Sequence, residues 1–291
     1  MQYKLYKKGQ IIKLSHFANA HKELSFNQII DFYSVFGGLN VENFTGELFL
    51  DIENLLLKNY EKINADFNFN AISSYALNLL AKNSRKKYSI LRKISHFKGL
   101  SIMQEMLNLG ILKLEKSKEE KFFKDKRYKL KKDLRSYVIQ DKLVFKDNFT
   151  RFFFRFLKSN EKLILKGEFD IVLNDIKLNL EHYQSFCFEQ LACEYLEEQF
   201  QVLNVQSYWN KELELDVYYK DENLCFIGEV KFKHKKICKN ILNQLKFKAK
   251  RLNLTPDYYI LFSKNGFSEQ FDKSAEKNVL LYDLNAFKKL I

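Results

Sequence analysis

The chain has 291 residues and a mass of 34.9 kDa, which is enough for two or three domains with hydrophobic cores of their own. Its formal net charge is +13 at pH 7, which favours a polyanionic partner such as nucleic acid over a small acidic metabolite. No stretch approaches the ~20 apolar residues of a membrane-spanning helix, and no apolar segment of a signal peptide follows the basic N-terminus. We therefore expect a cytoplasmic protein that does not bind membranes.

The first 80 residues are predicted to be mainly helical. Residues 1–24 indicate an arm that holds a short strand and the start of a helix. After the arm, apolar residues recur with the helical period in three stretches, which are Ile29–Phe36, Leu48–Tyr60 and Ile72–Leu80. We assign residues 1–80 to one helical segment.

Residues 81–165 are predicted to form a winged-helix-like module and a linker. The predicted elements are a helix opening in the basic run Arg85–Ile94, a helix over Leu100–Leu109, and wing strands at Gly110–Leu114 and Tyr128–Leu130 around a charged turn at Lys116–Lys126. The interval between the two helices is too short for the additional helix that a helix-turn-helix needs. A packing module with a solvated charged hairpin is therefore the alternative to DNA recognition by this segment.

Residues 166–291 are predicted to form a domain that mixes helices with a sheet. The predicted elements are a helix over His182–Phe200, strands over Glu212–Tyr219 and Leu224–Phe232, a helix with a basic face over Lys235–Leu252, a strand over Tyr258–Phe262, a helix over Ser268–Glu276 and a strand over Val279–Tyr282. The four polar residues between the first two strands suit a hairpin turn. The expected fold class is α+β or α/β, with a helical N-terminal part.

Acidic and basic side chains are concentrated on these two hairpin strands. Side chains alternate along a strand, so Glu214 and Asp216 share a face, as Glu229 and Lys231 do on the second strand. If the faces converge, Asp216 and Glu229 form a two-carboxylate pocket beside the Lys231 ammonium group, with Glu214 as a further acidic group. Hard divalent cations prefer oxygen ligands of this kind. The alternative is a surface ion pair, which contributes little to stability.

The residue types in this pocket suit the hydrolysis of a phosphodiester. Asp216 and Glu229 would bind Mg²⁺ or Mn²⁺, with the Val230 carbonyl as a third ligand. Lys231 would assist the attacking hydroxide and stabilise the negative charge of the transition state. On the preceding helix, Glu189 could hold a metal-bound water, and a solvated helix carboxylate is the alternative reading.

A basic cluster follows the second hairpin strand. It consists of Lys233, His234, Lys235, Lys236 and Lys239. Contacts of such lysines with phosphates position nucleic acid without reading its sequence, and they would offset the repulsion between the acidic pocket and a polyanion. A solvated lysine-rich turn is the alternative.

The spacing Asp-x12-Glu-x-Lys resembles the PD-(D/E)xK phosphodiesterase superfamily, which includes restriction endonucleases and archaeal Holliday-junction resolvases. The predicted order of elements over roughly residues 180–285 is also similar to the core of that superfamily. The resemblance implies a restriction-endonuclease-like fold and metal-dependent hydrolysis of nucleic acid. It adds Gln244, on the helix after Lys231, where several of these nucleases place a glutamine. An exposed polar residue would explain Gln244 equally well.

A longer resemblance runs from about residue 25 to the end of the chain. It is to archaeal-type ATPases that carry a nuclease-like C-terminal domain of unknown function. The similar motifs are the Phe-Gly-Gly of the ATPase lid at Phe36-Gly37-Gly38, here without the usual proline, the phenylalanine-rich segment Asp147–Phe156, the pair Phe188-Glu189, and the strand motifs Glu214–Val217 and Gly228–Lys231.

The chain has no Gly-x4-Gly-Lys-Ser/Thr run to bind phosphates, so we do not expect ATP hydrolysis. The expected partners are nucleic acid, in the first place DNA, and either a separate ATPase or a further copy of this chain. Two functions stay open. The first is a Mg²⁺- or Mn²⁺-dependent DNA nuclease, which the complete set of Asp, Glu and Lys favours. The second is a catalytically inactive nuclease-fold protein that binds DNA or serves an ATPase as an adaptor.

Overall fold

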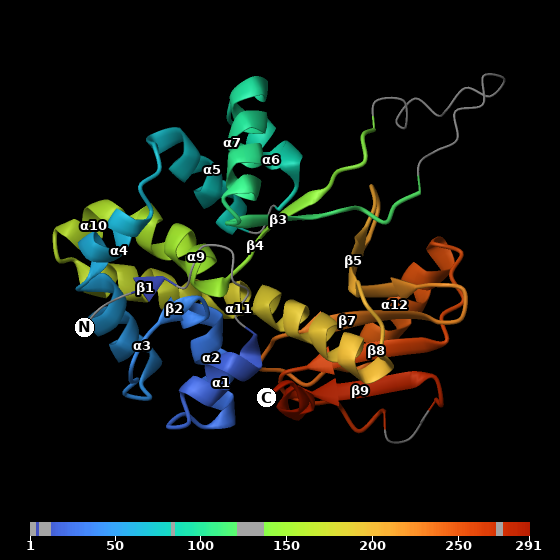
Figure 1. Cartoon of the computed structure of the whole chain (residues 1–291). Helices are drawn as coiled ribbons and strands as arrows, with labels where there is room; N and C mark the ends of the chain where they lie inside the picture. The colour runs from blue at the N-terminus through green and yellow to red at the C-terminus, as the bar shows by residue number, and fades with distance from the viewer. Residues whose placement is uncertain (1–3, 6–12, 83–84, 121–136, 272–275) are drawn as a thin grey trace. The chain divides into compact units, whose positions relative to one another are not determined.

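The computed structural model describes residues 4–5, 13–82, 85–120, 137–271 and 276–291. The chain divides into two compact units, one with residues 1–116 and 140–180 together with residue 291, and one with residues 117–139 and 181–290. Helices dominate the first unit, and the second contains a five-stranded mixed sheet (Figure 1). The predicted mixed class of helices and sheet is confirmed. Among the described residues, no helix has both the length and the hydropathy needed to cross a membrane.

The first unit consists of short helices and two small pairs of antiparallel strands. Its elements are β1 (Lys4–Leu5), α1 (Leu14–Ala20), α2 (Phe26–Phe36), β2 (Leu39–Asn40), α3 (Leu48–Asp51), η1 (Ile52–Leu57), α4 (Tyr60–Asp66), α5 (Ala71–Ala81), α6 (Lys87–Leu91), α7 (His96–Asn108), β3 (Leu112–Glu115), β4 (Lys142–Phe145), α9 (Asn148–Phe152), η2 (Phe153–Leu157), η3 (Lys158–Asn160), α10 (Glu161–Leu165) and the beginning of α11 (Phe169–Phe200). The stretch Leu48–Tyr60, predicted as one helix, is instead divided between α3, the π-helical turn η1 and the start of α4.

Two motifs that lie more than 100 residues apart in the sequence pack together in this unit. The amide of Phe149 donates to the carbonyl of Gly37 at 2.9 Å, and the side chain of Asn148 donates to the carbonyl of Tyr33 at 3.1 Å. The Phe-Gly-Gly motif and the phenylalanine-rich segment are therefore parts of one core. The phenylalanines that this segment buries are Phe149, Phe152, Phe153, Phe154 and Phe156.

The close approach of the two motifs requires glycine at position 38. Gly38 has a φ of +119°, and a Cβ there would lie 2.5 Å from Asp147 Oδ1. We expect Gly38→Ala to lower the free energy of unfolding by about 2–4 kcal/mol, because strained backbone and a steric clash add. Gly167→Ala is the matched control, since Gly167 also has a positive φ but has open space around the added Cβ. Urea unfolding of both variants checks this, and equal losses would show that the contact with Asp147 is unimportant.

Three helices and a strand pair form a winged-helix-like arrangement. Helices α5, α6 and α7 pack on one another, and α7 leads into β3, which pairs antiparallel with β4. The register joins Leu112 to Phe145 and Glu115 to Lys142. The order of these elements, three helices and then a strand pair, is the order that the predicted winged-helix-like module requires.

Two details of this arrangement differ from the sequence prediction. Helix α5, which the prediction assigned to the preceding segment, packs on α6 and α7. The second wing strand was expected at Tyr128–Leu130, which lies outside the described residues, and the strand that pairs with β3 is Lys142–Phe145. The predicted turn at Lys116–Lys126 also lies outside the described residues from position 121 onward.

The second unit contains the end of α11 and a sheet in the order β5-β6-β7-β8-β9. Its elements are β5 (Gln206–Trp209), β6 (Glu214–Lys220), β7 (Cys225–Lys231), α12 (Lys239–Arg251), β8 (Tyr258–Ser263), β9 (Val279–Asp283) and η5 (Leu284–Leu290). Strands β5, β6 and β7 are antiparallel neighbours, and β7, β8 and β9 are parallel. Helix α12 forms the crossover that a parallel pair such as β7 and β8 needs.

Two predicted helix starts and one predicted helix in this unit were wrong, and one strand was missed. Helix α11 starts at Phe169 rather than at His182, and α12 starts at Lys239 rather than at Lys235. The predicted helix Ser268–Glu276 is a turn in its described first part, and residues 272–275 lie outside the described residues. The short strand β5 was not predicted.

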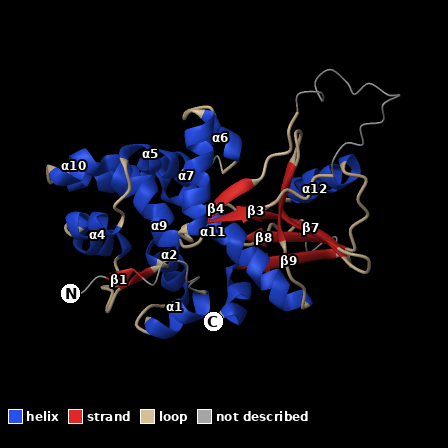
Figure 2. Ribbon diagram, turned by 45° about the horizontal axis from the view of Figure 1, so that its top comes forward, coloured by secondary structure: helices blue, strands red, loops and turns tan. Residues whose placement is uncertain are grey.

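Helices α11 and α12 cover opposite faces of the sheet (Figure 2). In β7, the Phe226 ring lies 4.8 Å from that of Phe200 on α11. The next residue, Ile227, packs in a cluster with Leu242 and Leu245 of α12. Because successive side chains of a strand point to opposite faces, these contacts place one helix on each side.

A bulge interrupts β6 next to the middle of the strand. In the pairing of β5 with β6, Gln206 is opposite Tyr218 and Tyr208 is opposite Leu215, so β6 has one residue more than β5 over this interval. Leu215 and Tyr218 consequently both contact the cluster on the α12 side of the sheet. The strict alternation assumed from the sequence is therefore wrong here. Bulges are known to redirect side chains near functional sites, and this one includes Asp216.

Candidate active site

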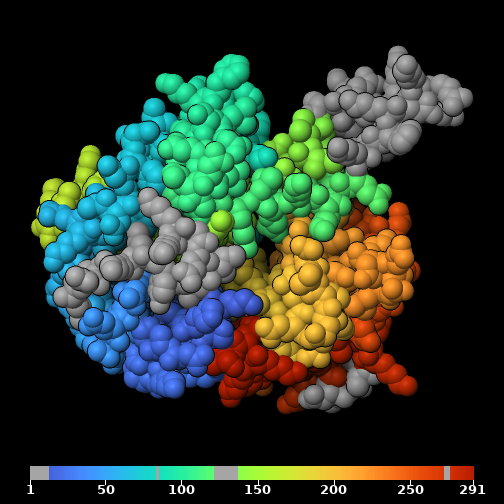
Figure 3. Space-filling view, viewed as in Figure 1, coloured from blue at the N-terminus to red at the C-terminus, as the bar shows by residue number. Residues whose placement is uncertain are grey.

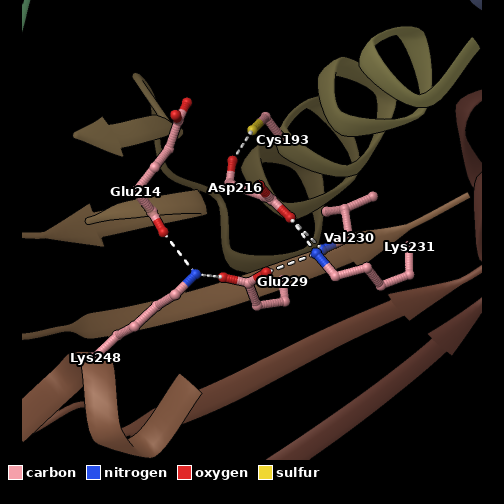
Figure 4. Close-up of polar contacts among 7 residues, drawn as sticks. All are labelled: Cys193, Glu214, Asp216, Glu229, Val230, Lys231 and Lys248. Atoms are coloured by element: carbon pink, nitrogen blue, oxygen red, sulfur yellow. Dashed lines mark hydrogen bonds and ion pairs between the residues drawn. The ribbon is translucent and has the colours of Figure 1, made fainter. Parts of the chain in front are cut away.

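Strands β6 and β7 bring three of the predicted site residues together. Lys231 Nζ donates to Glu229 Oε2 at 2.6 Å and to Asp216 Oδ2 at 3.2 Å (Figure 4). These two carboxylate oxygens are therefore less than about 6 Å apart, a separation that one hydrated cation can span. The side chain of Glu229 is 7% exposed, that of Asp216 19% and that of Lys231 27%. The group is thus partly shielded from water, and the Asp216 and Lys231 side chains keep some exposure to it.

The backbone of β7 fixes the Asp216 carboxylate. The Val230 amide donates to Asp216 Oδ2 at 2.8 Å, in the direction of β6. Because the amide and carbonyl of one strand residue point toward the same neighbouring strand, the Val230 carbonyl faces the side on which Asp216 lies. On the other side, Cys193 Sγ of α11 is 4.0 Å from the Asp216 carbonyl oxygen. Asp216 is therefore held between β7 and α11.

A second lysine, which the sequence analysis did not select, completes the group. Lys248 Nζ of α12 forms an ion pair with Glu229 Oε1 and donates to the Glu214 carbonyl at 2.7 Å (Figure 4). The Glu214 carboxylate itself points away from the other site residues in this view. Lys248 lies one helical turn after Gln244 on α12, and this spacing from a candidate site residue was the available signal.

The electrostatics of the site follow from burial and from the mixture of charges. Burial raises the pKa of Asp216 above its ordinary value, and the nearby Glu229 carboxylate raises it further. Burial alone would lower the pKa of Lys231, but the Asp216 and Glu229 carboxylates outweigh burial and raise that pKa well above its ordinary value. Lys231 is therefore firmly protonated at neutral pH.

The other two predicted catalytic residues lie on helices that contact this group. Glu189 is half-buried on α11, one helical turn before Cys193. Gln244 is exposed on α12, one turn before Lys248. Glu189 and Gln244 therefore lie on the two helices that also carry Cys193 and Lys248.

The predicted basic cluster emerges directly from the end of β7. Lys233, Lys235 and Lys236 are exposed, and Lys239 is half-buried at the start of α12. The turn that carries them is anchored by its backbone, because Asn265 Nδ2 donates to the His234 carbonyl at 2.6 Å. Three exposed ammonium groups thus follow the acidic pocket within five residues of Lys231.

The donor set fits a hard divalent cation. Asp216, Glu229 and the Val230 carbonyl offer only oxygen atoms, and Mg²⁺ is commonly bound by one or two carboxylates while it keeps several waters. Within the described part of the chain, no group of three or more His, Cys, Asp or Glu side chains could hold a metal ion. A structural zinc site, which needs four such ligands, therefore does not occur among the described residues.

Comparison with known proteins gives relatives without an assigned activity. Residues 153–241 match a family described as archaeal and bacterial proteins of unknown function. An uncharacterized protein of Methanocaldococcus jannaschii is 31% identical over 155 residues, which cover 49% of this chain and 34% of the relative. The chain therefore spans about a third of the length of that relative. No solved structure matches the chain significantly.

The family match and the candidate site coincide. The matched residues run from η2 through β6 and β7 to the start of α12, so they include Asp216, Glu229 and Lys231. The winged-helix-like arrangement and Lys248 lie outside the match.

Proposed function

We propose that this protein hydrolyses phosphodiester bonds of nucleic acid, most simply DNA, in a reaction that depends on Mg²⁺ or Mn²⁺. The observation that carries the proposal is the convergence of Asp216 and Glu229 on the Lys231 ammonium group, at 3.2 and 2.6 Å. Acidic ligands for a hard cation and a fixed positive charge in one half-buried site are what this chemistry needs.

The roles of the residues follow from their positions. Asp216, Glu229 and the Val230 carbonyl would hold the cation, which supplies Lewis acidity and a more acidic water when it is bound. Lys231 places its ammonium group beside the carboxylates, where it can meet a non-bridging phosphate oxygen and stabilise the charge that develops there. The Val230 amide orients Asp216, so the site is prepared before substrate binds.

The topology supports the same proposal. After the long helix α11 and the short strand β5 comes the antiparallel hairpin β6–β7, which bears the charged residues. The crossover helix α12 and the parallel strands β8 and β9 follow it. This is the order of the PD-(D/E)xK core, which the sequence motif resembles.

Surface features of the first unit favour DNA as the nucleic acid. In the winged-helix-like arrangement, α6 and α7 lie at the surface of the space-filling view (Figure 3). The turn between them and the start of α7 expose the basic residues Arg92, Lys93 and Lys98, together with Phe97, which is 86% exposed. Recognition helices of winged-helix proteins meet the major groove with such N-terminal residues.

Cleavage of a mixed panel of substrates tests the proposal. Single-stranded, duplex and branched DNA and the corresponding RNA are incubated with the full chain in Mg²⁺, in Mn²⁺ and in EDTA. We expect cleavage of at least one DNA substrate in the presence of metal and none in EDTA. Cleavage confined to RNA would correct the substrate, and metal-independent cleavage would contradict the site.

The exposed lysines after β7 yield a separate prediction for binding. The triple variant Lys233→Ala, Lys235→Ala, Lys236→Ala is expected to weaken DNA binding at all sequences alike. It should also reduce the slope of log K against log salt by roughly 2–3, because each phosphate contact contributes about 0.9. The measurement is fluorescence anisotropy with labelled duplex DNA between 50 and 200 mM salt, roughly the range over which such contacts are screened.

The control for this prediction is a triple variant with the same change in net charge at a different place in the chain. It replaces three exposed lysines of the first unit by alanine, namely Lys22, Lys62 and Lys166. If the control loses as much affinity as the test variant, the lysines after β7 act only through net charge.

A further inference from the structure

Lys248 occupies a position that the proposed cation would need. Its Nζ contacts Glu229 Oε1, while Lys231 Nζ contacts Glu229 Oε2. Both oxygens of this buried carboxylate are therefore already paired with an ammonium group. A metal ion that binds Glu229 must replace at least one of these two contacts.

The ion-paired group itself holds as many positive as negative charges. Two carboxylates, Asp216 and Glu229, face two ammonium groups, Lys231 and Lys248. A divalent cation added to this set would leave an excess of positive charge in a half-buried site, which is unfavourable at short range. Metal binding is therefore expected to be coupled to the departure of one lysine.

The structure indicates which lysine can leave. Lys231 lies on the same strand as Glu229 and bridges both carboxylates. Lys248 reaches the site from α12 and contacts one of these two carboxylates, that of Glu229, together with the Glu214 carbonyl. Its long side chain has many rotamers, so it can turn to water without moving the backbone.

We propose that Lys248 is a tethered cation that holds Glu229 in the metal-free protein and competes with the divalent cation for it. The inference rests on the proposed function, because it assigns a regulator to the same site. Displaced by metal, the Lys248 ammonium group remains within reach of the pocket, where it can pair with a phosphate of the nucleic acid. Lys248 thus sets the metal concentration at which the site fills.

The test measures Mn²⁺ affinity by isothermal titration calorimetry and melting temperature in EDTA, without use of cleavage. Lys248→Met keeps the length of the side chain and removes its charge. We expect this variant to bind Mn²⁺ about tenfold more tightly than the wild type, because the competing charge is gone. In EDTA it should melt at a lower temperature, because Glu229 has lost a partner, and Mn²⁺ should raise its melting temperature more than that of the wild type.

Two further variants make the result specific. Lys250→Met removes an exposed charge from the same helix and should bind Mn²⁺ as the wild type does. Lys248→Arg keeps the charge and should bind Mn²⁺ no more tightly than the wild type. A gain confined to Lys248→Met supports the proposal.

The contrary outcomes separate this inference from the function on which it rests. If the wild type binds Mn²⁺ and Lys248→Met binds it equally or more weakly, the competition is refuted and the metal site stands. If Lys250→Met gains as much affinity for Mn²⁺ as Lys248→Met, the gain comes from the change in net charge and the contact of Lys248 with Glu229 is not its cause. If Mn²⁺ binds to none of the four proteins, the proposed metal site falls together with the inference.

Discussion

Lys231→Met is expected to reduce cleavage of DNA by at least about a hundredfold while the protein stays folded, as the loss of one prepositioned charge stabiliser does in other enzymes. The ammonium group lies between Asp216 Oδ2 and Glu229 Oε2, and its pKa is raised, so it supplies a permanent charge where a phosphate would bind. Methionine preserves the apolar stem. The measurement is the single-turnover rate on the best substrate of the panel, with circular dichroism to confirm folding.

The control for this variant is Lys220→Met, which removes an exposed charge at the far end of β6. It should cleave at the wild-type rate. Wild-type cleavage by Lys231→Met would remove Lys231 from the chemistry, whereas equal losses in both variants would point to net charge rather than to position.

Divalent cations are expected to stabilise the wild type against thermal unfolding. A ligand bound only by the folded state adds RT ln(1 + [L]/Kd), so 1 mM Mn²⁺ at a site with a Kd of ~0.1 mM adds about 1.4 kcal/mol. Asp216→Asn should abolish this increment because it removes one ligand charge. In EDTA the variant should melt no lower than the wild type, since burial and Glu229 already raise the pKa of Asp216 and so disfavour its charge. Thermal melts with and without Mn²⁺ measure both effects.

Glu214→Gln is the matched control for the metal experiment. Glu214 lies on the same strand, and its carboxylate points away from the site (Figure 4). The variant should keep the full metal increment. The adaptor alternative would be favoured if Mg²⁺ and Mn²⁺ leave the melting temperature of the wild type unchanged while the protein binds DNA in a salt-dependent way.

Much of the sheet could be predicted from the sequence because its strands carry strong local signals. The apolar run Tyr258–Phe262 and the charged hairpin strands are recognisable without knowledge of their neighbours. Strand β5 has only four residues, and its pairing with β6 depends on contacts that no local pattern records. The partner of β3 was missed for the same reason, because β4 follows β3 only after a long interval.

In the candidate site, too, residues close in the sequence could be predicted, whereas features that depend on contacts between distant segments could not. The spacing of Asp216, Glu229 and Lys231 was sufficient to select them, since the hairpin keeps them close. The bulge at Asp216 could not be foreseen, because it arises from the pairing of β6 with β5. Lys248 was hidden among the many lysines of α12, and only the packing of that helix against the sheet distinguishes it.

The measurement that bears most directly on the central claim is cleavage of the best panel substrate by the wild type and by Glu229→Gln, in Mg²⁺, in Mn²⁺ and in EDTA. Glu229 contacts both lysines, and glutamine keeps its shape while removing its charge. The account predicts cleavage by the wild type only when metal is present, and a loss of at least about a hundredfold in the variant. Metal-dependent cleavage at equal rates by both proteins would contradict it, as would a wild type that binds DNA but cleaves no substrate under any of these conditions.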